Sequence, residues 1–313
     1  MNQSHTLPTH WRPYVMLVIG IIAVSFASIF IRWGQEESVS SLVLAGARLT
    51  VASAVLTPLV WARYRAQLRA LRPDDLKWAL VSGLVLGLHF ATWISSLEYT
   101  AVVNSVTLVT TNPLWVALLA PFVLGEKLNR WALVGLALAL GGGILVSVNG
   151  AAGDPPTRSD PLLGNSLALI GAVMAAIYFI IGRRLRARLS VIVYIWLVYS
   201  AAALILIGVV IVTGQKVGGL SSEAYLWMLL MGLIPQLIGH SAFNYALGFL
   251  PAAFVSLAVL GEPLGSGVLA IVLLKEWPTW LQLVGAVLIL SGIALASNTK
   301  STVKTEAQIE LPG

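Results

Sequence analysis

The sequence predicts an all-α integral membrane protein in which ten transmembrane helices form two inverted five-helix repeats. Three observations predict this fold: an apolar composition, ten hydrophobic stretches of membrane-spanning length and an internal repeat. Of the 313 residues, 58% are hydrophobic and 10% are charged, and the mean hydropathy is +0.88. Because a soluble domain carries about 25% charged residues, most of this protein's surface is expected to face lipid. The sequence contains no cysteine, which excludes disulfides, cysteine-bound metals and thiol catalysis.

Ten stretches are apolar and long enough to cross a bilayer core, which needs roughly 20 helical residues. They are Pro13–Ile31, Val39–Ala62, Leu76–Ser96, Ala101–Leu124, Trp131–Val148, Leu163–Gly182, Val191–Thr213, Ala224–Leu247, Pro251–Leu274 and Pro278–Ser297. The connections after the third and eighth stretches are very short, so the helices that they join are antiparallel neighbours. The longest connection, around residues 150–161, contains Gly-Asp-Pro-Pro and is predicted to link two halves.

The distribution of positive charge predicts the orientation. If both termini are cytoplasmic, most of the 19 Lys and Arg residues lie in cytoplasmic segments, while Arg32, Arg158, Lys216 and Lys275 lie outside. This positive-inside asymmetry predicts a multi-pass protein of the plasma or inner membrane with cytoplasmic tails at 1–12 and 298–313. It also accounts for the net charge of +6, so no nucleic-acid partner is expected.

The internal repeat joins residues 97–147 to residues 247–297 at a constant offset of 150, with 16 identities in 51 positions. Half of the identities are leucine pairs, but the others include Pro113 with Pro263 and Glu126 with Glu276. Since five spans are an odd number, the second copy (163–297) is expected to be inverted relative to the first (13–148). Inverted repeats are typical of secondary transporters, whose substrate site lies near the membrane midplane. The alternative is a gene duplication in a membrane protein that does not transport.

Two related motifs point to a family. The fourth span carries Asn112-Pro113, an apolar run and Gly125-Glu126, and the ninth carries Glu262-Pro263, an apolar run and Lys275-Glu276. This pattern resembles the EamA-type branch of the drug/metabolite transporter superfamily, over about residues 13–297. The resemblance implies a central cavity lined by spans 1–4 and 6–9, and export of small metabolites such as amino acids, amines or drugs by alternating access. It does not imply one substrate.

Four ionisable residues lie well inside the predicted spans, away from their ends, where such groups are costly and usually functional. Glu262 falls near the middle of the ninth span, where its carboxyl group could carry a coupling proton or bind a substrate amine. Arg48 could bind a substrate carboxylate, and a fixed ion pair with Glu262 or snorkelling is the alternative. His89 and His240 could relay protons, and interhelical hydrogen bonds are the alternative.

Polar and aromatic side chains accompany these residues on the same helix faces. Trp93 lies four residues after His89, and Asn244 lies four residues after His240. The predicted substrate-binding set is His89, Trp93, Asn112, Trp115, Tyr178, Tyr199, His240, Asn244 and Glu262, and the predicted coupling or ion-pair set is Arg48, His89, His240 and Glu262. Pro113 and Pro263 are expected to break their helices and to open backbone carbonyls toward the cavity.

The sequence has no phosphate-binding motif and no evident catalytic cluster. We therefore expect secondary rather than ATP-driven transport, no enzymatic activity, no cofactor and no metal. The expected partners are a small-molecule substrate, the lipid bilayer and protons, and the expected state is a monomer. An uncoupled facilitator is the first alternative. The second is an intramembrane enzyme, which would need a metal at His89, His240 and Glu262.

Overall fold

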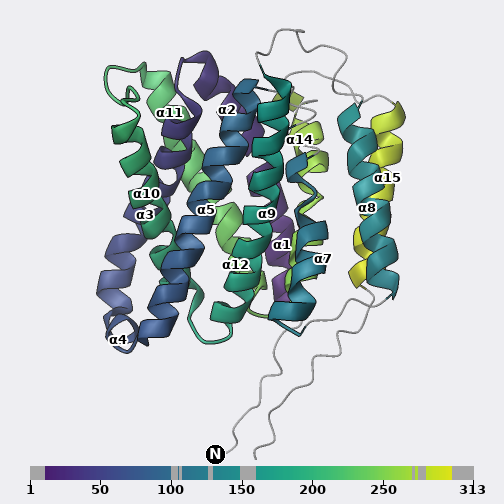
Figure 1. The fold of residues 1–313 in the computed structure, drawn as a ribbon, viewed down its shortest axis with the longest axis horizontal. Coiled ribbons are helices and arrows are strands. Elements are labelled where there is room, and N and C mark those ends of the chain that lie inside the picture. The colour runs from purple at the N-terminus through teal and green to yellow at the C-terminus, as the bar shows by residue number, and fades with distance from the viewer. Residues whose placement is uncertain are drawn as a thin grey trace, which may run out of the picture.

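The computed structural model describes residues 11–99, 105, 108–125, 130–148, 160–269, 272–273 and 280–297. All regular elements within these ranges are helices, most of which stand side by side along one direction (Figure 1). The helices are α1 (Arg12–Ser25), α2 (Ala27–Glu36), α3 (Ser41–Arg63), α4 (Arg65–Arg69), α5 (Pro73–Tyr99), α7 (Asn112–Val123), α8 (Arg130–Val148), α9 (Pro161–Arg186), α10 (Val191–Val212), α11 (Ser222–Met231), the π-helix η2 (Gly232–His240), α12 (Ser241–Ala246), α13 (Ala252–Val259), α14 (Glu262–Leu269) and α15 (Trp280–Ser297).

Six helical stretches of the described chain are long and apolar enough to cross a membrane. They are Arg12–Glu36, Ser41–Arg63, Pro73–Tyr99, Leu162–Arg186, Val191–Val212 and Ser222–Ala246. Shorter apolar helices lie within the predicted fourth, fifth and tenth spans, and α13 and α14 lie within the predicted ninth. Parts of the fourth, ninth and tenth predicted spans fall outside the described residues. The described part of the chain is thus all-helical and contains several helices that could cross a membrane.

Side-chain caps explain several helix starts. Ser40 accepts a hydrogen bond from the Val43 amide (3.4 Å), Asp160 from the Leu163 amide (3.0 Å) and Ser221 from the Ala224 amide (3.1 Å). Each cap satisfies a backbone N–H that the helix itself leaves unpaired. At the other end of a helix, Gly125 follows α7 with a φ of 68°, the conformation that favours glycine after a C-terminus.

Two helices extend beyond the apolar runs that predicted them. The first predicted span ends at Ile31, yet α2 continues to Glu36, and the third ends at Ser96, yet α5 continues to Tyr99. The physical reason is that backbone hydrogen bonds continue where the side chains become polar. Glu98, in the last turn of α5, accepts a hydrogen bond from the Ser41 amide at the start of α3 (3.2 Å).

Sequence-related helices from the two halves pack against each other. Helix α3 contacts α10, where Ser53 and Ser200 are joined by a hydrogen bond of 2.6 Å and Trp196 donates to the Thr57 hydroxyl (3.0 Å). These contacts make the two helices antiparallel, since residues later in α3 meet residues earlier in α10. Helices α8 and α15 also pack closely and lie together at one side of the bundle (Figure 1).

The α8–α15 contact depends on glycine. A Cβ atom added to Gly142 would lie 2.9 Å from the Ile289 amide nitrogen and would collide with the Gly285 carbonyl. A Cβ atom added to Gly292 would lie 2.9 Å from the Ala139 amide nitrogen and would collide with the Gly135 carbonyl. Small residues at such positions let membrane helices approach closely.

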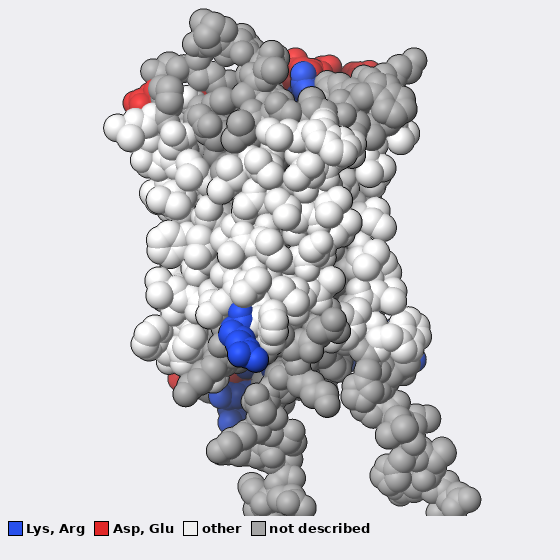
Figure 2. Space-filling view, turned by 90° about the vertical axis from the view of Figure 1, so that its right-hand side faces the viewer, with Lys and Arg blue, Asp and Glu red and all other residues white. Residues whose placement is uncertain are grey.

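Charges lie at the two ends of the bundle, and an uncharged band separates them on the face that Figure 2 shows. One end carries α4 and the turn between α9 and α10, where Arg188 pairs with Asp75 (3.2 Å) and Ser190 donates to Gln67 (2.6 Å). The opposite end carries Glu37, which accepts a hydrogen bond from Ser221 (2.6 Å). The uncharged band is the surface expected to face hydrocarbon.

Candidate functional site

Several helices are interrupted beside one cavity. The first span breaks at Phe26 between α1 and α2, and the ninth breaks at Leu260 and Gly261 between α13 and α14. Helix α7 starts at Asn112 after a turn at 110–111, and η2 winds as a π-helix that contains Pro235. Local π-helical segments are frequent at functional sites, and interrupted helices are typical of transporter binding sites.

The two motif prolines occupy the same place in their helices. Pro113 is the second residue of α7 and Pro263 is the second residue of α14. Proline is favoured in a first helical turn, where its missing N–H would have no partner in any case. Asn112 and Glu262, which are related by the repeat, therefore both begin a helix.

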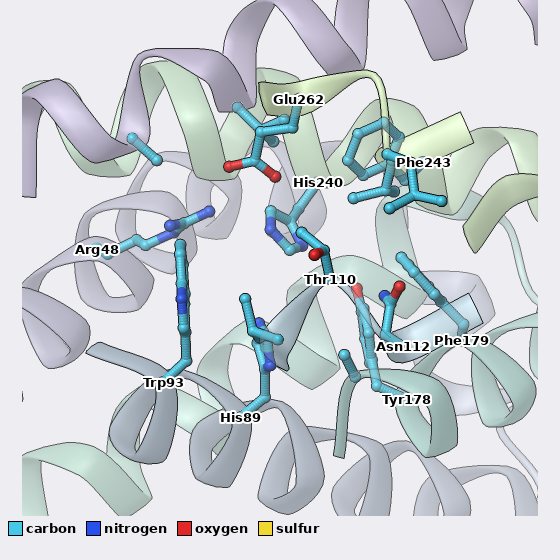
Figure 3. A pocket seen from close by; sticks show the side chains of 16 residues that line it. Arg48, His89, Trp93, Thr110, Asn112, Tyr178, Phe179, His240, Phe243 and Glu262 are labelled. Carbon is cyan, nitrogen blue, oxygen red and sulfur yellow. The ribbon is translucent and has the colours of Figure 1, made fainter. Parts of the chain in front are cut away.

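The cavity has a volume of about 630 Å³, including its open mouth. Its lining is contributed by Val24, Ala27, Arg48, His89, Trp93, Val109, Thr110, Asn112, Ala175, Tyr178, Phe179, His240, Phe243, Val259, Leu260 and Glu262. Polar side chains from both halves of the sequence face one another across it (Figure 3). Apolar and aromatic side chains form the remaining wall.

Arg48 is 1% exposed and its guanidinium group is held from two sides. Its Nε donates to the Gln236 side-chain oxygen (2.6 Å), and its Cζ lies 4.2 Å from the centre of the Phe90 ring. Its Nη1 has no hydrogen-bond partner in the part of the chain that the structure describes. No ion pair joins Arg48 to Glu262 within the described part of the chain, although both line the cavity (Figure 3).

Glu262 reaches the cavity from the first turn of α14. Its backbone carbonyl lies 3.2 Å from the Ser25 hydroxyl, whose single hydrogen it shares with the Ile21 carbonyl at 2.7 Å. These bonds connect the break in the ninth span to helix α1. The carboxyl group of Glu262 is thereby placed where two interrupted spans meet.

The two histidines differ in their bonding. His89 Nδ1 bonds to the Gly171 carbonyl on α9 (2.9 Å), and its ring stacks on Trp93 at 5.8 Å. Because a carbonyl only accepts, His89 carries its proton on Nδ1. His240 Nδ1 is buried and has no partner among the described residues, and its ring lies edge-on to Phe90 at 5.2 Å.

A hydrogen-bonded group lies behind one wall of the cavity. The two hydrogens of the Asn244 side-chain amide are shared among three oxygens: the Tyr178 hydroxyl, the His240 carbonyl (2.7 Å) and the more distant Tyr199 hydroxyl (3.4 Å). Tyr199 also bonds to Ser241 (3.2 Å). Tyr178 faces the cavity, while Asn244 and Tyr199 support it from behind.

The structure brings most of the predicted residues together. The predicted residues that line the cavity are Arg48, His89, Trp93, Asn112, Tyr178, His240 and Glu262. Trp115 is not part of the lining, and its Nε1 donates to Thr111 (3.3 Å). Sequence reasoning missed Thr110, Phe179 and Phe243. Of these three, only Phe243 could have been predicted, because it follows His240 by three residues and so lies on the same helix face.

A metal centre is not formed by the described residues. No three of their His, Asp and Glu side chains gather closely enough to hold a metal ion. The arrangement instead offers one fixed cation, one carboxyl group and several hydrogen-bond donors around a small space. Such a site can bind and orient a small polar molecule.

Comparisons with known proteins agree with this picture. The model of the EamA-like transporter family matches twice, at residues 11–148 and 162–298. An uncharacterized transporter of Archaeoglobus fulgidus is 22% identical over 290 residues, which cover 91% of this chain and 97% of that protein. The uncharacterized transporter YxxF of Bacillus subtilis is 27% identical over 226 residues, which cover 71% of this chain and 70% of that protein. A protein crystal structure matches with a TM-score of 0.76 at 21% identity, over 91% of this chain and 96% of that one.

Proposed function

The chain belongs to the EamA-like transporter family, and from that premise we propose that it is a secondary transporter that exports small metabolites by alternating access. The substrate class in this proposal comprises amino acids, amines and related compounds. The observation that carries the proposal is the cavity in which Arg48, His89, His240 and Glu262 meet between apolar helices. Ionisable groups are retained at such depth where they serve a substrate or ion pathway.

The proposed topology has ten spans in two inverted repeats, 13–148 and 163–297. Three findings support it. The family model matches the chain twice, α3 packs antiparallel to its sequence counterpart α10, and α7 and α14 both begin one residue before a repeat-related proline. The two repeats would move relative to each other around the cavity, as transporters of this architecture do.

The proposed location is the plasma or inner membrane, with both termini in the cytoplasm. The end of the bundle that carries α4 and the α9–α10 turn would face the cytoplasm, because it is rich in arginine. The described arginines of that end include Arg63, Arg65, Arg69, Arg72, Arg183, Arg184, Arg186 and Arg188. The proposed state is a monomer that needs no cofactor.

The proposed coupling ion is the proton, with Glu262 as its carrier. A proton and a cationic substrate group would compete for the same carboxyl group, so that release of one favours binding of the other. His240 is the better placed of the two histidines to assist, since its Nδ1 has no partner among the described residues, whereas His89 Nδ1 is bonded to a backbone carbonyl.

An uncoupled facilitator is the main alternative, and it differs in failing to accumulate substrate against a gradient. The enzyme alternative is less favoured, because the matched relatives are named transporters and the described residues gather no metal-binding group.

The test is flux into proteoliposomes with and without an imposed pH gradient. Amino acids, polyamines, nucleosides and quaternary amines would be tried with wild type, Glu262→Gln and Trp115→Phe, whose side chain lies outside the cavity lining. We expect gradient-driven accumulation by wild type and Trp115→Phe and only passive equilibration by Glu262→Gln. Equal gradient-driven accumulation by Glu262→Gln would contradict the coupling role, and flux without accumulation in wild type would support the facilitator.

A further inference from the structure

Two buried groups of the cavity wall that can only donate hydrogen bonds have no partner among the described residues. They are Nη1 of Arg48 and Nε1 of Trp93, and both residues line the cavity. Neither atom can accept a hydrogen bond, because a guanidinium group and an indole nitrogen only donate. A buried donor that stays unpaired is costly, so most such groups in proteins have a partner. A ligand group that only accepts hydrogen bonds would give both donors a partner.

The guanidinium group of Arg48 is fixed in a defined orientation. Gln236 occupies the Nε edge at 2.6 Å, and Phe90 lies against the flat face at 4.2 Å. Helix η2 can approach α3 this closely because residue 232 is glycine, where a Cβ atom would collide with Val51. With Nε occupied, Nη1 is a terminal donor that a ligand can use. Because the guanidinium group is already held in place, it loses little further freedom when it donates to a carboxylate.

We propose that Arg48 and Trp93 form a carboxylate-binding subsite for the transported molecule, and that Gln236 positions Arg48 for this task. The inference rests on the proposed transport function and deepens it by naming the chemical class of the substrate. The substrate is a small organic carboxylate whose apolar body lies against the side chains of Val24, Phe179 and Phe243.

The charges of the cavity favour a monoanion over a phosphate. Arg48 is the only Lys or Arg among the described residues that line it, and Glu262 adds an acidic group to the same space. A dianionic phosphate would find one permanent positive charge and a neighbouring carboxyl group. A carboxylate needs only the positive charge of Arg48, and a zwitterion could use both Arg48 and Glu262. Phosphate esters therefore serve as negative controls.

The test measures ligand-induced thermal stabilisation of the full chain in lipid nanodiscs. The first probe set shares a branched apolar body and consists of 4-methylpentanoate, leucine, leucinamide and 3-methylbutylamine. A second set replaces that body by a phenyl ring, and phenyl phosphate is added as the dianion. We expect stabilisation by the carboxylate-bearing probes of at least one set, and dissociation constants at least about tenfold higher for the matching amide and amine, a difference of 1.4 kcal/mol.

Two substitutions and a matched control locate the effect. Trp93→Phe keeps an aromatic ring but removes Nε1, and it should weaken carboxylate binding several-fold. Arg48→Lys should weaken it at least about tenfold, because an ammonium group lacks the planar fork. Trp115→Phe should bind as wild type does, since Trp115 is bonded to Thr111 outside the lining.

Gln236→Met tests the positioning role separately, because it keeps the length of the side chain and removes the oxygen that accepts from Arg48 Nε. We expect the preference for a carboxylate over its matching amide to fall several-fold. If Gln236 only stabilised the helices, Gln236→Met would lower the melting temperature and leave that preference as in wild type, and its positioning role would be rejected.

The subsite is overturned if no carboxylate probe stabilises the wild type, or if Trp93→Phe and Arg48→Lys both bind carboxylates as tightly as wild type. It is also overturned if the amide and amine bind as well as the acid. The proteoliposome assay separates this failure from failure of the transport proposal, because a protein that moves amines but ignores carboxylates would lose the subsite and remain a transporter.

Discussion

Asn112 in the first half of the chain and Glu262 in the second are separated by the repeat offset of 150, and both begin a helix beside the cavity. One contributes a neutral amide and the other a carboxyl group. Arg48 and its approximate counterpart Tyr199 show the opposite distribution, since the ionised residue lies in the first half and the neutral one in the second. The two halves thus match in packing and differ in chemistry, and the differences lie at the cavity or directly behind its lining.

The two histidines also occupy corresponding spans and differ in their hydrogen bonds. His89 and His240 lie 151 residues apart in corresponding spans. His89 lies in a regular α-helix with Nδ1 bonded to Gly171, while His240 ends a π-helix and its Nδ1 has no partner among the described residues. One histidine thus joins two helices, and the other keeps an unused nitrogen beside the cavity.

Exchanging Asn112 and Glu262 should have the largest effect, which is expected on pH-driven flux. Glu262→Asn should lower pH-driven flux in proteoliposomes at least about tenfold, because it removes the proposed proton carrier. Adding Asn112→Glu to that variant should restore part of the flux, since the carboxyl group returns to the same cavity from the other half. No recovery in a well-folded double variant would show that the two positions are not equivalent.

Glycines that both halves retain test the symmetry of packing. Gly142→Ala and Gly292→Ala should each destabilise the protein by about 1–3 kcal/mol, because each added methyl group collides with the facing backbone. Gly141→Ala is the matched control, since nothing lies within 4 Å of its Cβ position, and it should stabilise the helix by up to about 1 kcal/mol. Thermal unfolding in detergent measures all three. Unequal losses of stability for Gly142→Ala and Gly292→Ala would show that α8 and α15 do not pack equivalently.

The histidines should give the smallest effect. His89→Phe should cost about 1 kcal/mol of stability, because it removes the hydrogen bond to Gly171. His240→Phe should change stability by less than about 0.5 kcal/mol, because its Nδ1 loses no partner. Thermal unfolding compares the two variants under one condition. A larger loss for His240→Phe would reverse the roles assigned to the two rings.

Much of this fold could be predicted from the sequence, because the length of an apolar run and a constant repeat offset are both local properties. Several residues that line the cavity could be predicted for a related reason. A histidine, arginine or glutamate inside an apolar span is rare and therefore easy to recognise in the sequence. Pro113 and Pro263 are predicted from the sequence to break their helices, and in the structure each lies in the first turn of a helix that follows an interruption, where proline is favoured.

Other features depend on contacts that no local pattern records. Gln236 meets Arg48 across 188 residues of sequence, and the π-helix that carries Gln236 has no distinct residue signature. Trp115 shares a polar helix face with Thr111, yet the two bond to each other rather than line the cavity. Tyr199 and Asn244 lie one layer behind the lining, a distinction that helical spacing alone cannot make.

The most direct test of the central claim, that this cavity is a transport site reached in turn from each side of the membrane, uses the absence of native cysteine. Ala175→Cys places one thiol in the cavity lining, and Leu204→Cys, at a position that is 71% exposed within α10, places one on the lipid-facing side. Both would be treated with a membrane-impermeant thiol reagent in right-side-out and inside-out vesicles. For a site of this kind, we expect that the cavity thiol is labelled from either side, that a transported substrate slows its labelling, and that the lipid-facing thiol stays unlabelled. Labelling of the cavity thiol from one side only, unaffected by substrate, would contradict this claim.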